Sequence, residues 1–485
     1  METLTAAAVA TAKQVPLCVD LDGTLVKCDT LYDSCLHAAR RHPSLLAKMP
    51  FWLLRGKSGF KAALAQYVQP SASHLPYNES LLAFLKQEYD LGRELYLVTG
   101  ADARIAIEVA SHLGIFAGIV SSDGTVNLTG NNKLAALQKQ FGPTGFDYIG
   151  NSAADIPALA HARIAMLANP HRSALVKARL KQIPIAQVFN GQRRTSVALF
   201  SAIRVRQWPK NLLIFLPLFL AHQTDNGHML LKGLIAFFAF SFVASAGYIL
   251  NDLLDIEVDR KHPRKCRRPF AAGDLSPVSG LFLVLSLLVA SVGLVTLQPP
   301  HFLIWLALYF ATTVSYSILL KKIALVDVLV LAGLYTVRLI CGSIATGAPL
   351  SAWMESFALF FFLSLAIVKR YSELHALRLK HAIPQNDRGY RIDDIEQMRS
   401  FGTASSYAAV VVFVLYVNSP EIQRLYRHPH LLWLITPLIV YWINRVWLLA
   451  HRGELDEDPV IFAVTDRVSL LIGLLSAAIV VLGAR

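Results

Sequence analysis

Cysteine is scarce and scattered in this chain. Its 485 residues contain five cysteines, and no two of them are spaced C-x-x-C. Because paired cysteines of that spacing mark most zinc and redox sites, we expect neither a zinc site nor a disulfide framework. The first residues also lack the basic start and long apolar core of a secretory signal peptide. We therefore expect the N-terminal domain to stay in the cytosol.

Hydrophobic residues make up 54% of the chain but are unevenly distributed. Residues 1–200 carry interspersed charges, as a soluble domain does, whereas 209–485 form a succession of apolar runs. A run of about 20 apolar residues can cross a bilayer. By length we predict about nine spans, of which the first and seventh are short: 209–222, 230–250, 279–297, 302–320, 324–346, 352–368, 404–418, 431–449 and 462–482.

Basic residues gather in alternate loops between these runs. Loops 251–278 and 369–403 contain six and seven Lys or Arg, and only 419–430 departs from the alternation. The opposite loops 223–229, 298–301 and 347–351 contain none. The positive-inside rule then predicts a multi-pass protein of the bacterial inner membrane with a cytosolic N-terminal domain. An odd number of spans places the C-terminus outside.

The formal net charge is +13, yet no run combines aromatic and basic residues in the manner of RNA-binding motifs. We therefore expect no nucleic-acid partner. In a membrane protein, such an excess of cations suits cytoplasmic loops, anionic membrane lipids and phosphate groups.

Strand-like and helix-like segments alternate through residues 1–170. Short strands are predicted at 15–19, 94–98 and 117–120 and around Tyr148–Ile149, with a helical region at about 30–92. Polar residues follow the strands, at the edge where such sheets bind ligands. We predict an α/β, Rossmann-like domain. Residues 171–208 are basic and helix-prone, which predicts a linker or interfacial helix on the membrane surface before the all-α membrane domain 209–485.

Four short motifs follow one another in the N-terminal domain. They are D-x-D-G-T at 20–24, Thr99 after a strand, Lys133 before a helix and G-N-S-A-A-D at 150–155. Two carboxylates on one tight turn can share a site, where one attacks phosphorus and the other protonates the leaving oxygen. The set resembles the haloacid dehalogenase phosphatase superfamily, over about residues 14–170.

This resemblance implies a role for each motif residue. Asp20 would be the nucleophile and Asp22 the general acid/base, whereas Thr99 and Lys133 would bind the phosphoryl oxygens. The implied Mg²⁺ ligands are Asp20, Asp22, Asn151 and Asp155. The helical insert 30–92 would be the cap that selects the substrate.

Asn151 departs from the superfamily pattern, in which Asp is usual at this place. An amide oxygen can still coordinate Mg²⁺, but it removes one negative charge and should weaken metal binding. An inactive, structural phosphatase domain is therefore the alternative. Within the cap, Pro50–Leu54 could contact the bilayer or pack in the core, and we favour the core.

The segment Asn251–Pro269 reads N-D-L-L-D-I-E-V-D-R-K-H-P-R-K-C-R-R-P, directly after an apolar run. Asn251, Asp255 and Asp259 lie four residues apart and would form one ladder of oxygen ligands on a helix, with Asp252 close by. Carboxylates backed by Arg and Lys suit the binding of a diphosphate through Mg²⁺, because the cations neutralise the remaining phosphate charge.

A protein of about nine spans with N-D-x-x-D-x-x-x-D at a cytoplasmic helix end resembles the UbiA family of intramembrane prenyltransferases. The second motif of that family, usually D-x-x-x-D, is reduced here to Asp327. D-R-x-H-P-x-K-x-x-R-P at 259–269 and R-x-R-Q-W-x-K-N at 204–211 resemble a subgroup, the decaprenyl-phosphate phosphoribosyltransferases. The resemblance covers about 200–485.

The subgroup implies transfer of 5-phosphoribose from phosphoribosyl diphosphate (PRPP) to a polyprenyl phosphate. Asn251, Asp252, Asp255 and Asp259 would hold Mg²⁺ on the diphosphate, with Asp255 and Asp259 central to catalysis. We expect Lys265 and Arg268 at the PRPP phosphates and Lys322 or Arg338 nearer the lipid phosphate. The full set of phosphate-binding candidates is Lys210, Asn211, Arg260, Lys265, Arg267, Arg268, Lys322, Arg338, Lys369 and Arg370.

We therefore expect a bifunctional enzyme with Mg²⁺ in both domains. The membrane domain would make polyprenyl-phosphoryl-ribose 5-phosphate, and the phosphatase domain would remove the 5-phosphate. One alternative is an aromatic prenyltransferase that uses a polyprenyl diphosphate, and another is a membrane-anchored phosphate sensor. The sequence makes no prediction of oligomeric state.

Overall fold

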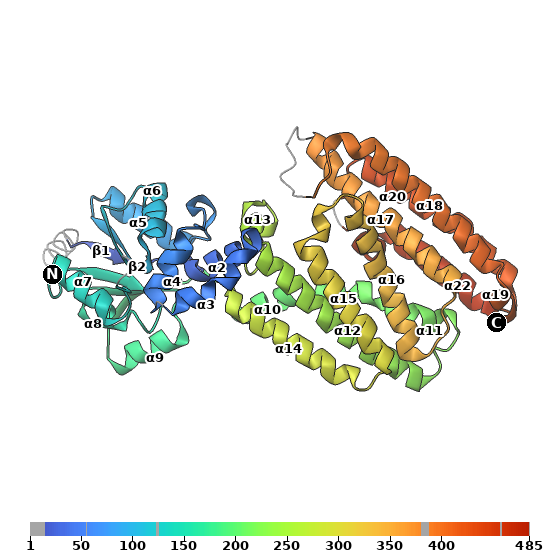
Figure 1. The fold of residues 1–485 in the computed structure, drawn as a ribbon, viewed down its shortest axis with the longest axis horizontal. Helices are drawn as coiled ribbons and strands as arrows, with labels where there is room; N and C mark the ends of the chain where they lie inside the picture. The colour runs from blue at the N-terminus through green and yellow to red at the C-terminus, as the bar shows by residue number, and fades with distance from the viewer. Residues whose placement is uncertain (1–14, 55, 123–125, 380–387, 456–457, 485) are drawn as a thin grey trace, which may run out of the picture. The chain divides into compact units, whose positions relative to one another are not determined.

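The chain divides into two units, and the first of them is discontinuous in sequence. Unit 1 comprises Met1–Ile203 and Ile249–Phe282, and unit 2 comprises Arg204–Tyr248 and Leu283–Arg485. The computed structural model describes residues 15–54, 56–122, 126–379, 388–455 and 458–484 (Figure 1). The segment with the acidic motif therefore belongs to the same unit as the α/β domain.

Unit 1 is built on a sheet of six strands, in which every pair of neighbours is parallel. The strand order is β3-β2-β1-β4-β5-β6. The strands are β1 (Leu17–Val19), β2 (Leu95–Asp102), β3 (Gly118–Ser122), β4 (Asp147–Gly150), β5 (Ala165–Ala168) and β6 (Ile185–Phe189). This architecture confirms the Rossmann-like prediction and places β1, which precedes Asp20, in the middle of the sheet.

Helices cover both faces of this sheet, because each strand buries alternate side chains on opposite sides. Leu17 and Val19 pack in one apolar cluster with α5 and α6, whereas Cys18 packs in another with α7, α8 and α9. Figure 1 shows the two groups on opposite sides of the strands. The helices are α5 (Glu79–Asp90), α6 (Ala103–Leu113), α7 (Asn131–Phe141), α8 (Ile156–His161) and α9 (Arg172–Leu180).

The predicted linker is wrong for its first part. Residues 172–189 form α9 and the edge strand β6, which pairs in parallel with β5. The prediction gave weight to the basic residues of this stretch and not to its apolar ones. Of these, Ile183 and Ile185 pack against the apolar cluster that contains Cys18. The rest of the predicted linker contains α10 (Thr195–Ile203) and the first residues of the 3-10 segment η3 (Val205–Phe215).

The insert after β1 is helical, as expected from the sequence. It contains α2 (Thr30–Arg41), η1 (Pro43–Ala47), α3 (Met49–Leu53), α4 (Gly56–Ala65), η2 (Ala72–His74) and then α5. The prediction that Pro50–Leu54 packs in the core is wrong for Phe51, Leu53 and Leu54, which are 69%, 56% and 85% exposed. The five-residue helix α3 packs on the rest of the insert through one side only. On that side, Trp52 stacks on Tyr67.

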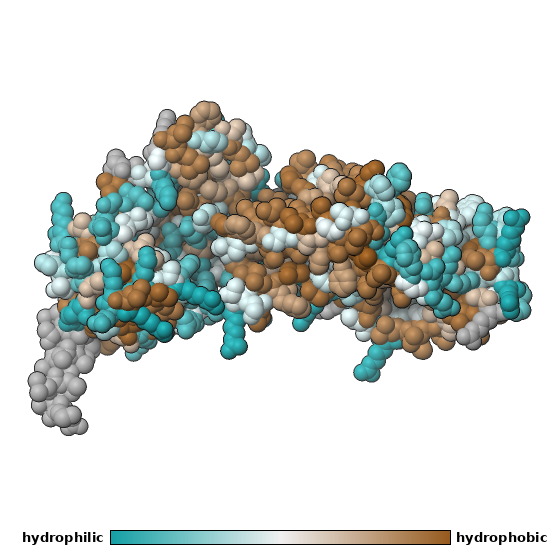
Figure 2. Space-filling view, turned by 90° about the horizontal axis from the view of Figure 1, so that it is seen from below, coloured by the Kyte–Doolittle hydropathy of each residue, from teal (hydrophilic) through white to brown (hydrophobic). Residues whose placement is uncertain are grey.

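Unit 2 is a bundle of long apolar helices. Among the described residues, eight helices are long and apolar enough to cross a membrane. Figure 2 shows hydrophobic residues over much of this unit on the face that it draws. The helices are α12 (Gly227–Leu254), α14 (Pro277–Val295), α15 (Pro300–Ile318), α16 (Val326–Thr346), α17 (Ala352–Leu379), α18 (Ile395–Val417, preceded by η6 from Ile392), α20 (Ile435–His451, preceded by η7 from Pro429) and α22 (Arg467–Ala484). The boundaries between the two units fall inside α12 and α14.

The span predicted at 209–222 is not a single α-helix. Residues Val205–Phe215 form the 3-10 segment η3, and only Leu216–Leu220 are α-helical, as α11. Pro209 lies inside η3 and Pro217 opens α11, and proline removes a backbone donor and restricts the preceding residue. The predicted last span also divides, into the short α21 (Pro459–Thr465) and α22.

Candidate active sites

The D-x-D-G-T motif forms a tight turn at the carboxyl end of β1. The Asp20 amide donates to the Ile149 carbonyl of the next strand over 3.0 Å. Gly23 has a φ of +74°, and a Cβ there would lie 2.0 Å from Asn151 Nδ2. Only glycine therefore permits both this turn and the close approach of Asn151. On the other side of the turn, Asp22 Oδ1 accepts the Thr30 amide over 2.9 Å.

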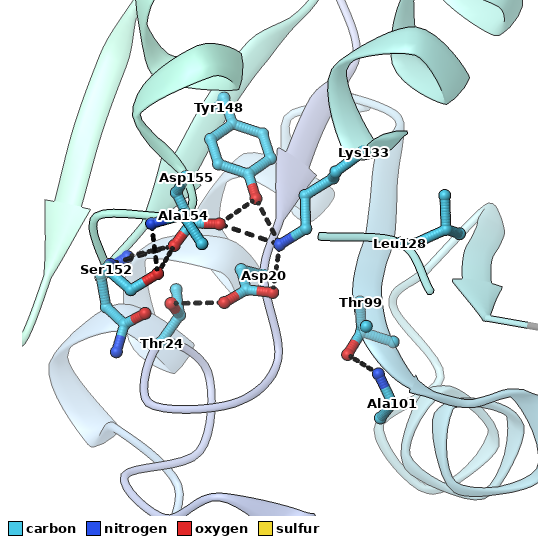
Figure 3. Close-up of polar contacts among 12 residues, drawn as sticks. Asp20, Thr24, Thr99, Ala101, Leu128, Lys133, Tyr148, Ser152, Ala154 and Asp155 are labelled. Carbon is cyan, nitrogen blue, oxygen red and sulfur yellow. Dashed lines mark hydrogen bonds and ion pairs between the residues drawn. The ribbon is translucent and has the colours of Figure 1, made fainter. Parts of the chain in front are cut away.

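Lys133 joins three of the polar groups at this edge of the sheet. Its Nζ donates to Asp20 Oδ1 at 2.8 Å and to Asp155 Oδ1 and the Tyr148 hydroxyl at 2.9 Å each (Figure 3). Tyr148 OH in turn donates to Asp155 Oδ1 over 2.9 Å. All four side chains are buried. The structure thus brings together Asp20, Lys133 and Asp155 from separate motifs and adds Tyr148, which the sequence reading missed.

Asp155 is saturated by protein donors. Besides Lys133 and Tyr148 on Oδ1, its Oδ2 accepts Ser152 N at 3.0 Å and Ser152 Oγ at 2.8 Å. Burial alone would raise the pKa of Asp155, but Lys133 and Ser152 outweigh it and lower the pKa to about 2. This anionic carboxylate therefore holds Lys133 in place, and the carboxyl and amide oxygens of Asp20, Asp22 and Asn151 fit Mg²⁺ better.

Burial raises the pKa of Asp20 to about 7, although Lys133 acts in the opposite direction. Burial and then Asp29 raise the pKa of Asp22 to about 7 as well. One buried and one half-buried carboxyl, both with raised pKa values and both in one turn, have the electrostatics of acid–base chemistry. A bound cation would favour their ionised forms. Thr99 lies on β2, where its Oγ1 accepts the Ala101 amide over 2.9 Å and keeps its own proton for a ligand.

The acidic motif of unit 1 follows a helix that breaks and resumes. Asn251 and Asp252 lie in the last turn of α12, Asp255 lies at the break, and Asp259 lies in α13 (Ile256–Lys261). The four-residue spacing survives in the backbone, because the Asp255 amide donates to the Asn251 carbonyl and the Asp259 amide to the Asp255 carbonyl.

Arginines hold the carboxylates of this motif. Arg268 Nη1 lies 3.0 Å from Asp252 Oδ1 and 2.6 Å from Asp259 Oδ2. Arg40 Nη1, from the cap helix α2, lies 3.1 Å from Asp255 Oδ1. Two carboxylates that share one cation can also share a metal ion, so Asp252 and Asp259 fit Mg²⁺ with Arg268 displaced toward a phosphate. Within the described residues, no three His, Cys, Asp or Glu side chains already form a metal-binding group.

The other basic candidates of unit 1 differ in their surroundings. Arg260 is buried and donates to Asp33 Oδ2 over 2.7 Å and to the Ala271 carbonyl over 3.1 Å, so its contacts are structural. Lys265 is partly exposed and Arg267 is exposed, both in η4 (Lys265–Arg267), which leaves their side chains accessible to a soluble anion.

In unit 2, two lysines share one carboxylate. Lys210 Nζ and Lys369 Nζ each lie 2.9 Å from Asp458 Oδ2. Burial opposes ionisation of Asp458, but the two lysines outweigh it and hold its pKa below the usual range. The cluster therefore carries a net positive charge and suits one further anion.

An apolar cavity of about 640 Å³ adjoins Lys210. Its lining comes from η3, α11, α16, α17, α20, α21 and α22, and includes Phe357 and Phe361. Besides Lys210, its polar lining groups are Ser469 and the indole N–H of Trp442, which bond to each other over 2.8 Å. The cavity can therefore hold a hydrocarbon, with a cation beside it.

Asp327, the remnant of the second motif, is neutralised by Arg370. Arg370 Nε donates to Asp327 Oδ2 over 2.6 Å, and its Nη1 donates to Glu373 Oε2 over 2.7 Å. The Tyr390 hydroxyl donates to Asp327 Oδ1 over 2.6 Å. Both Asp327 oxygens thus have buried protein donors. Arg268, which holds Asp252 and Asp259, is by contrast 27% exposed and has room to move aside.

Arg338 and Asn211 are bound to each other inside unit 2. Arg338 Nε donates to Asn211 Oδ1 over 2.9 Å, and Nη2 donates to the Tyr309 hydroxyl over 3.1 Å. Both residues are buried, so this network braces the helices, while Lys322 is exposed in η5 (Leu320–Lys322). Of the two residues expected nearer the lipid phosphate, Arg338 thus makes structural contacts, and Lys210 with Lys369 forms the cationic cluster beside the cavity.

Comparison with known proteins identifies the family. Residues 211–471 match the UbiA prenyltransferase family. The chain is 37% identical to the uncharacterized protein y4nM of Sinorhizobium fredii, over 96% of this chain and 90% of that one. It is 34% identical to the nodulation protein NoeC of Azorhizobium caulinodans, over 56% of this chain and 88% of that one. It is also 34% identical to the decaprenyl-phosphate phosphoribosyltransferase of Mycobacterium tuberculosis, over 44% of this chain and 72% of that one. The chain therefore belongs to the UbiA prenyltransferase family.

Proposed function

We propose that this protein transfers 5-phosphoribose from PRPP to a polyprenyl phosphate and then hydrolyses the 5-phosphate of the product. The observation that carries the first step is the apolar cavity of about 640 Å³ beside Lys210, which with Lys369 flanks Asp458. The name of the Mycobacterium tuberculosis relative supports the same reaction class. The two phosphatase-type carboxylates that Lys133 bonds to, Asp20 and Asp155, support the second step.

The lipid acceptor has two parts, and unit 2 has a suitable place for each. The isoprenoid chain would lie in the cavity, because apolar surface is favoured there over water. Its phosphate would bind Lys210 and Lys369, whose joint charge exceeds that of the single Asp458 carboxylate. A phosphate held there at the end of a buried chain can serve as a nucleophile.

The donor carries its diphosphate on the anomeric carbon of ribose. Asp252, Asp255 and Asp259 would hold Mg²⁺, which neutralises the leaving diphosphate when bound. A lipid phosphate oxygen would form a bond to the anomeric carbon while the bond to the diphosphate breaks. Arg268, displaced from Asp252 and Asp259, would donate to the diphosphate oxygens.

The Arg370 pair argues against an aromatic prenyltransferase. That reaction needs a lipid diphosphate and, in the UbiA pattern, a second carboxylate motif. Here Asp327 is buried against Arg370 at 2.6 Å, and burying a paired charge in this way favours a structural role. In the proposed reaction, the carboxylates of 251–259 alone would hold the diphosphate of the soluble sugar through Mg²⁺.

The phosphatase step would use the edge of the unit 1 sheet. Asp20 would attack the phosphorus of the 5-phosphate, Asp22 would protonate the departing ribose oxygen, and water would then hydrolyse the phosphoaspartate. Lys133, held by Asp155 and Tyr148, would neutralise the phosphoryl oxygens. The product would be polyprenyl-phosphoryl ribose.

The test supplies membranes containing the protein with radiolabelled PRPP, a polyprenyl phosphate and Mg²⁺. Wild type should give the dephosphorylated lipid, Asp20→Asn should accumulate the phosphorylated lipid, and Asp255→Asn should give neither. Alkylation of an aromatic acid by a polyprenyl diphosphate, with no product from PRPP, would instead establish the aromatic prenyltransferase.

A further inference from the structure

Helix α2 touches both acidic sites of unit 1. At its N-terminal end, the Thr30 amide donates to Asp22 Oδ1 over 2.9 Å. At its C-terminal end, Arg40 Nη1 lies 3.1 Å from Asp255 Oδ1 and donates to the Leu254 carbonyl over 3.2 Å. These ends lie in the phosphatase-type motif and in the acidic motif of the UbiA family, so one short rigid element contacts both.

A buried ion pair joins the middle of α2 to α13, the helix that contains Asp259. Arg260 Nη1 lies 2.7 Å from Asp33 Oδ2, with side-chain exposures of 7% and 4%. Further along α2, His37 and Arg41 each lie 3.3 Å from a carboxylate oxygen of Glu257. Because α13 contributes both Glu257 and Arg260, the cap helix and the acidic motif are joined along more than two turns of α2.

Asp255 needs such support because it lies where the helix is interrupted. Its φ and ψ are −98° and 7°, outside the helical pattern, between the end of α12 and the start of α13. The backbone bonds across the break are kept, from the Asp255 amide to the Asn251 carbonyl and from the Asp259 amide to the Asp255 carbonyl, so the direction of the Asp255 side chain is what remains to be fixed. Arg40 contacts both the Asp255 carboxylate and the last carbonyl of α12, so it restrains both sides of the break.

We propose that Arg40 is a positioning residue for the transferase, supplied by the phosphatase-type domain. This inference rests on the proposed function of the acidic motif. Arg40 orients the Asp255 carboxylate, which would be a ligand of Mg²⁺, and the other N–H groups of the guanidinium would be available to the diphosphate oxygens of PRPP. The N-terminal domain is thus a part of the transferase as well as the second catalyst.

The first test measures transfer from PRPP by the purified full-length protein in lipid vesicles. Residues that orient metal ligands typically contribute about 10- to 100-fold to metal affinity or activity. Arg40→Ala should therefore raise both the KM for PRPP and the Mg²⁺ concentration at half-maximal rate by about tenfold or more. Arg40→Lys, which keeps the charge but not the fork of donors, should recover part of the loss.

Arg41→Ala is the matched control, because Arg41 is the next residue of α2, is more exposed and pairs with Glu257 rather than Asp255. It should change both parameters by less than about twofold. Hydrolysis of para-nitrophenyl phosphate by Arg40→Ala should stay near the wild-type rate, which reports that the α/β domain is folded.

The second test does not depend on turnover. Hydrogen exchange of the ligand-free protein should be faster in Arg40→Ala over 251–261 and unchanged over 95–102 in the sheet. If wild type transfers phosphoribose but Arg40→Ala matches it, or if Arg41→Ala is equally impaired, the inference is wrong. If wild type makes no product from PRPP, the proposed function itself fails, and the exchange result separately shows whether Arg40 restrains the motif.

Discussion

Arg370 donates to Asp327 over 2.6 Å, and both side chains are buried inside the helical unit. An arginine thus neutralises Asp327, the carboxylate that remains of the second UbiA motif. The pair is also completed on both sides, by Glu373 on the arginine and by Tyr390 on the aspartate. Its contribution should therefore be to the stability of the unit.

Arg370→Ala should destabilise the protein strongly. Removing one partner of a buried ion pair leaves an uncompensated charge, which costs about 3–5 kcal/mol. The thermal unfolding midpoint of the detergent-solubilised protein should fall by several degrees. Arg399→Ala removes an exposed pair with Glu396 and should change the midpoint little. Equal midpoints for the two variants would contradict this role of Arg370.

Lys133→Met should abolish most phosphatase activity while leaving transfer intact. It removes the ammonium that lies within 2.9 Å of Asp20, Asp155 and Tyr148. Loss of such a preorganised charge typically lowers kcat by about 100- to 1000-fold. The measurement is the ratio of phosphorylated to dephosphorylated lipid product. Lys139→Ala, an exposed change on the same helix, should leave that ratio unaltered.

Tyr148→Phe should weaken the same step by a smaller factor. The hydroxyl bonds to Lys133 and to Asp155, and a hydrogen bond to a charged group is worth about 1.5–3 kcal/mol. We expect kcat for dephosphorylation to fall about tenfold or more, measured under single-turnover conditions with the isolated phosphorylated lipid. An unchanged kcat would mean that Asp155 alone is enough to hold Lys133.

Asn151→Asp should lower the Mg²⁺ requirement of the phosphatase. The substitution restores a negative charge next to the Gly23 turn, and Mg²⁺ binds carboxylates more strongly than amides. A Mg²⁺ titration of lipid dephosphorylation should show half-saturation at a several-fold lower concentration. The transferase titration of the same variant serves as its internal control and should not move.

Lys369→Ala should raise the KM for the lipid phosphate and leave the KM for PRPP unchanged. Lys369 is one of two ammonium groups on Asp458, so its loss removes the net positive charge of that cluster. We expect the lipid KM to rise about tenfold, the value of one charge-assisted bond. Arg378→Ala, exposed on the same helix α17, is the matched control. A selective rise in the PRPP KM would place the lipid phosphate elsewhere.

The sequence predicted what local patterns determine. A short, continuously apolar run predicted β1, and the motif around Asp20 predicted the edge of the sheet at which Lys133 and Asp155 meet. The sequence did not predict contacts between residues that lie far apart in the chain. Nothing near Arg40 indicates that it pairs with Asp255, 215 residues later, and nothing near Tyr148 marks its hydroxyl as a partner of Lys133.

Two further predictions, the linker at 171–208 and the phosphate contact of Arg338, rested on charged residues and were not supported by the structure. The lysines and arginines of 171–208 indicated a membrane-surface linker and concealed β6, whose apolar positions pack on the sheet. Arg338 was expected near a phosphate because an ionised group inside an apolar span is costly. The structure satisfies that side chain with Asn211 and Tyr309 instead.

The discontinuity of unit 1 has a consequence for biosynthesis. Asp33 leaves the ribosome more than 200 residues before Arg260, its buried partner, and α12 must be made in between. A nascent chain that ends near residue 203 would therefore carry an unneutralised carboxylate under its cap. We expect the α/β domain to reach its final stability only after translation has passed the first long apolar helix, so that completion of this domain waits for the synthesis of α12.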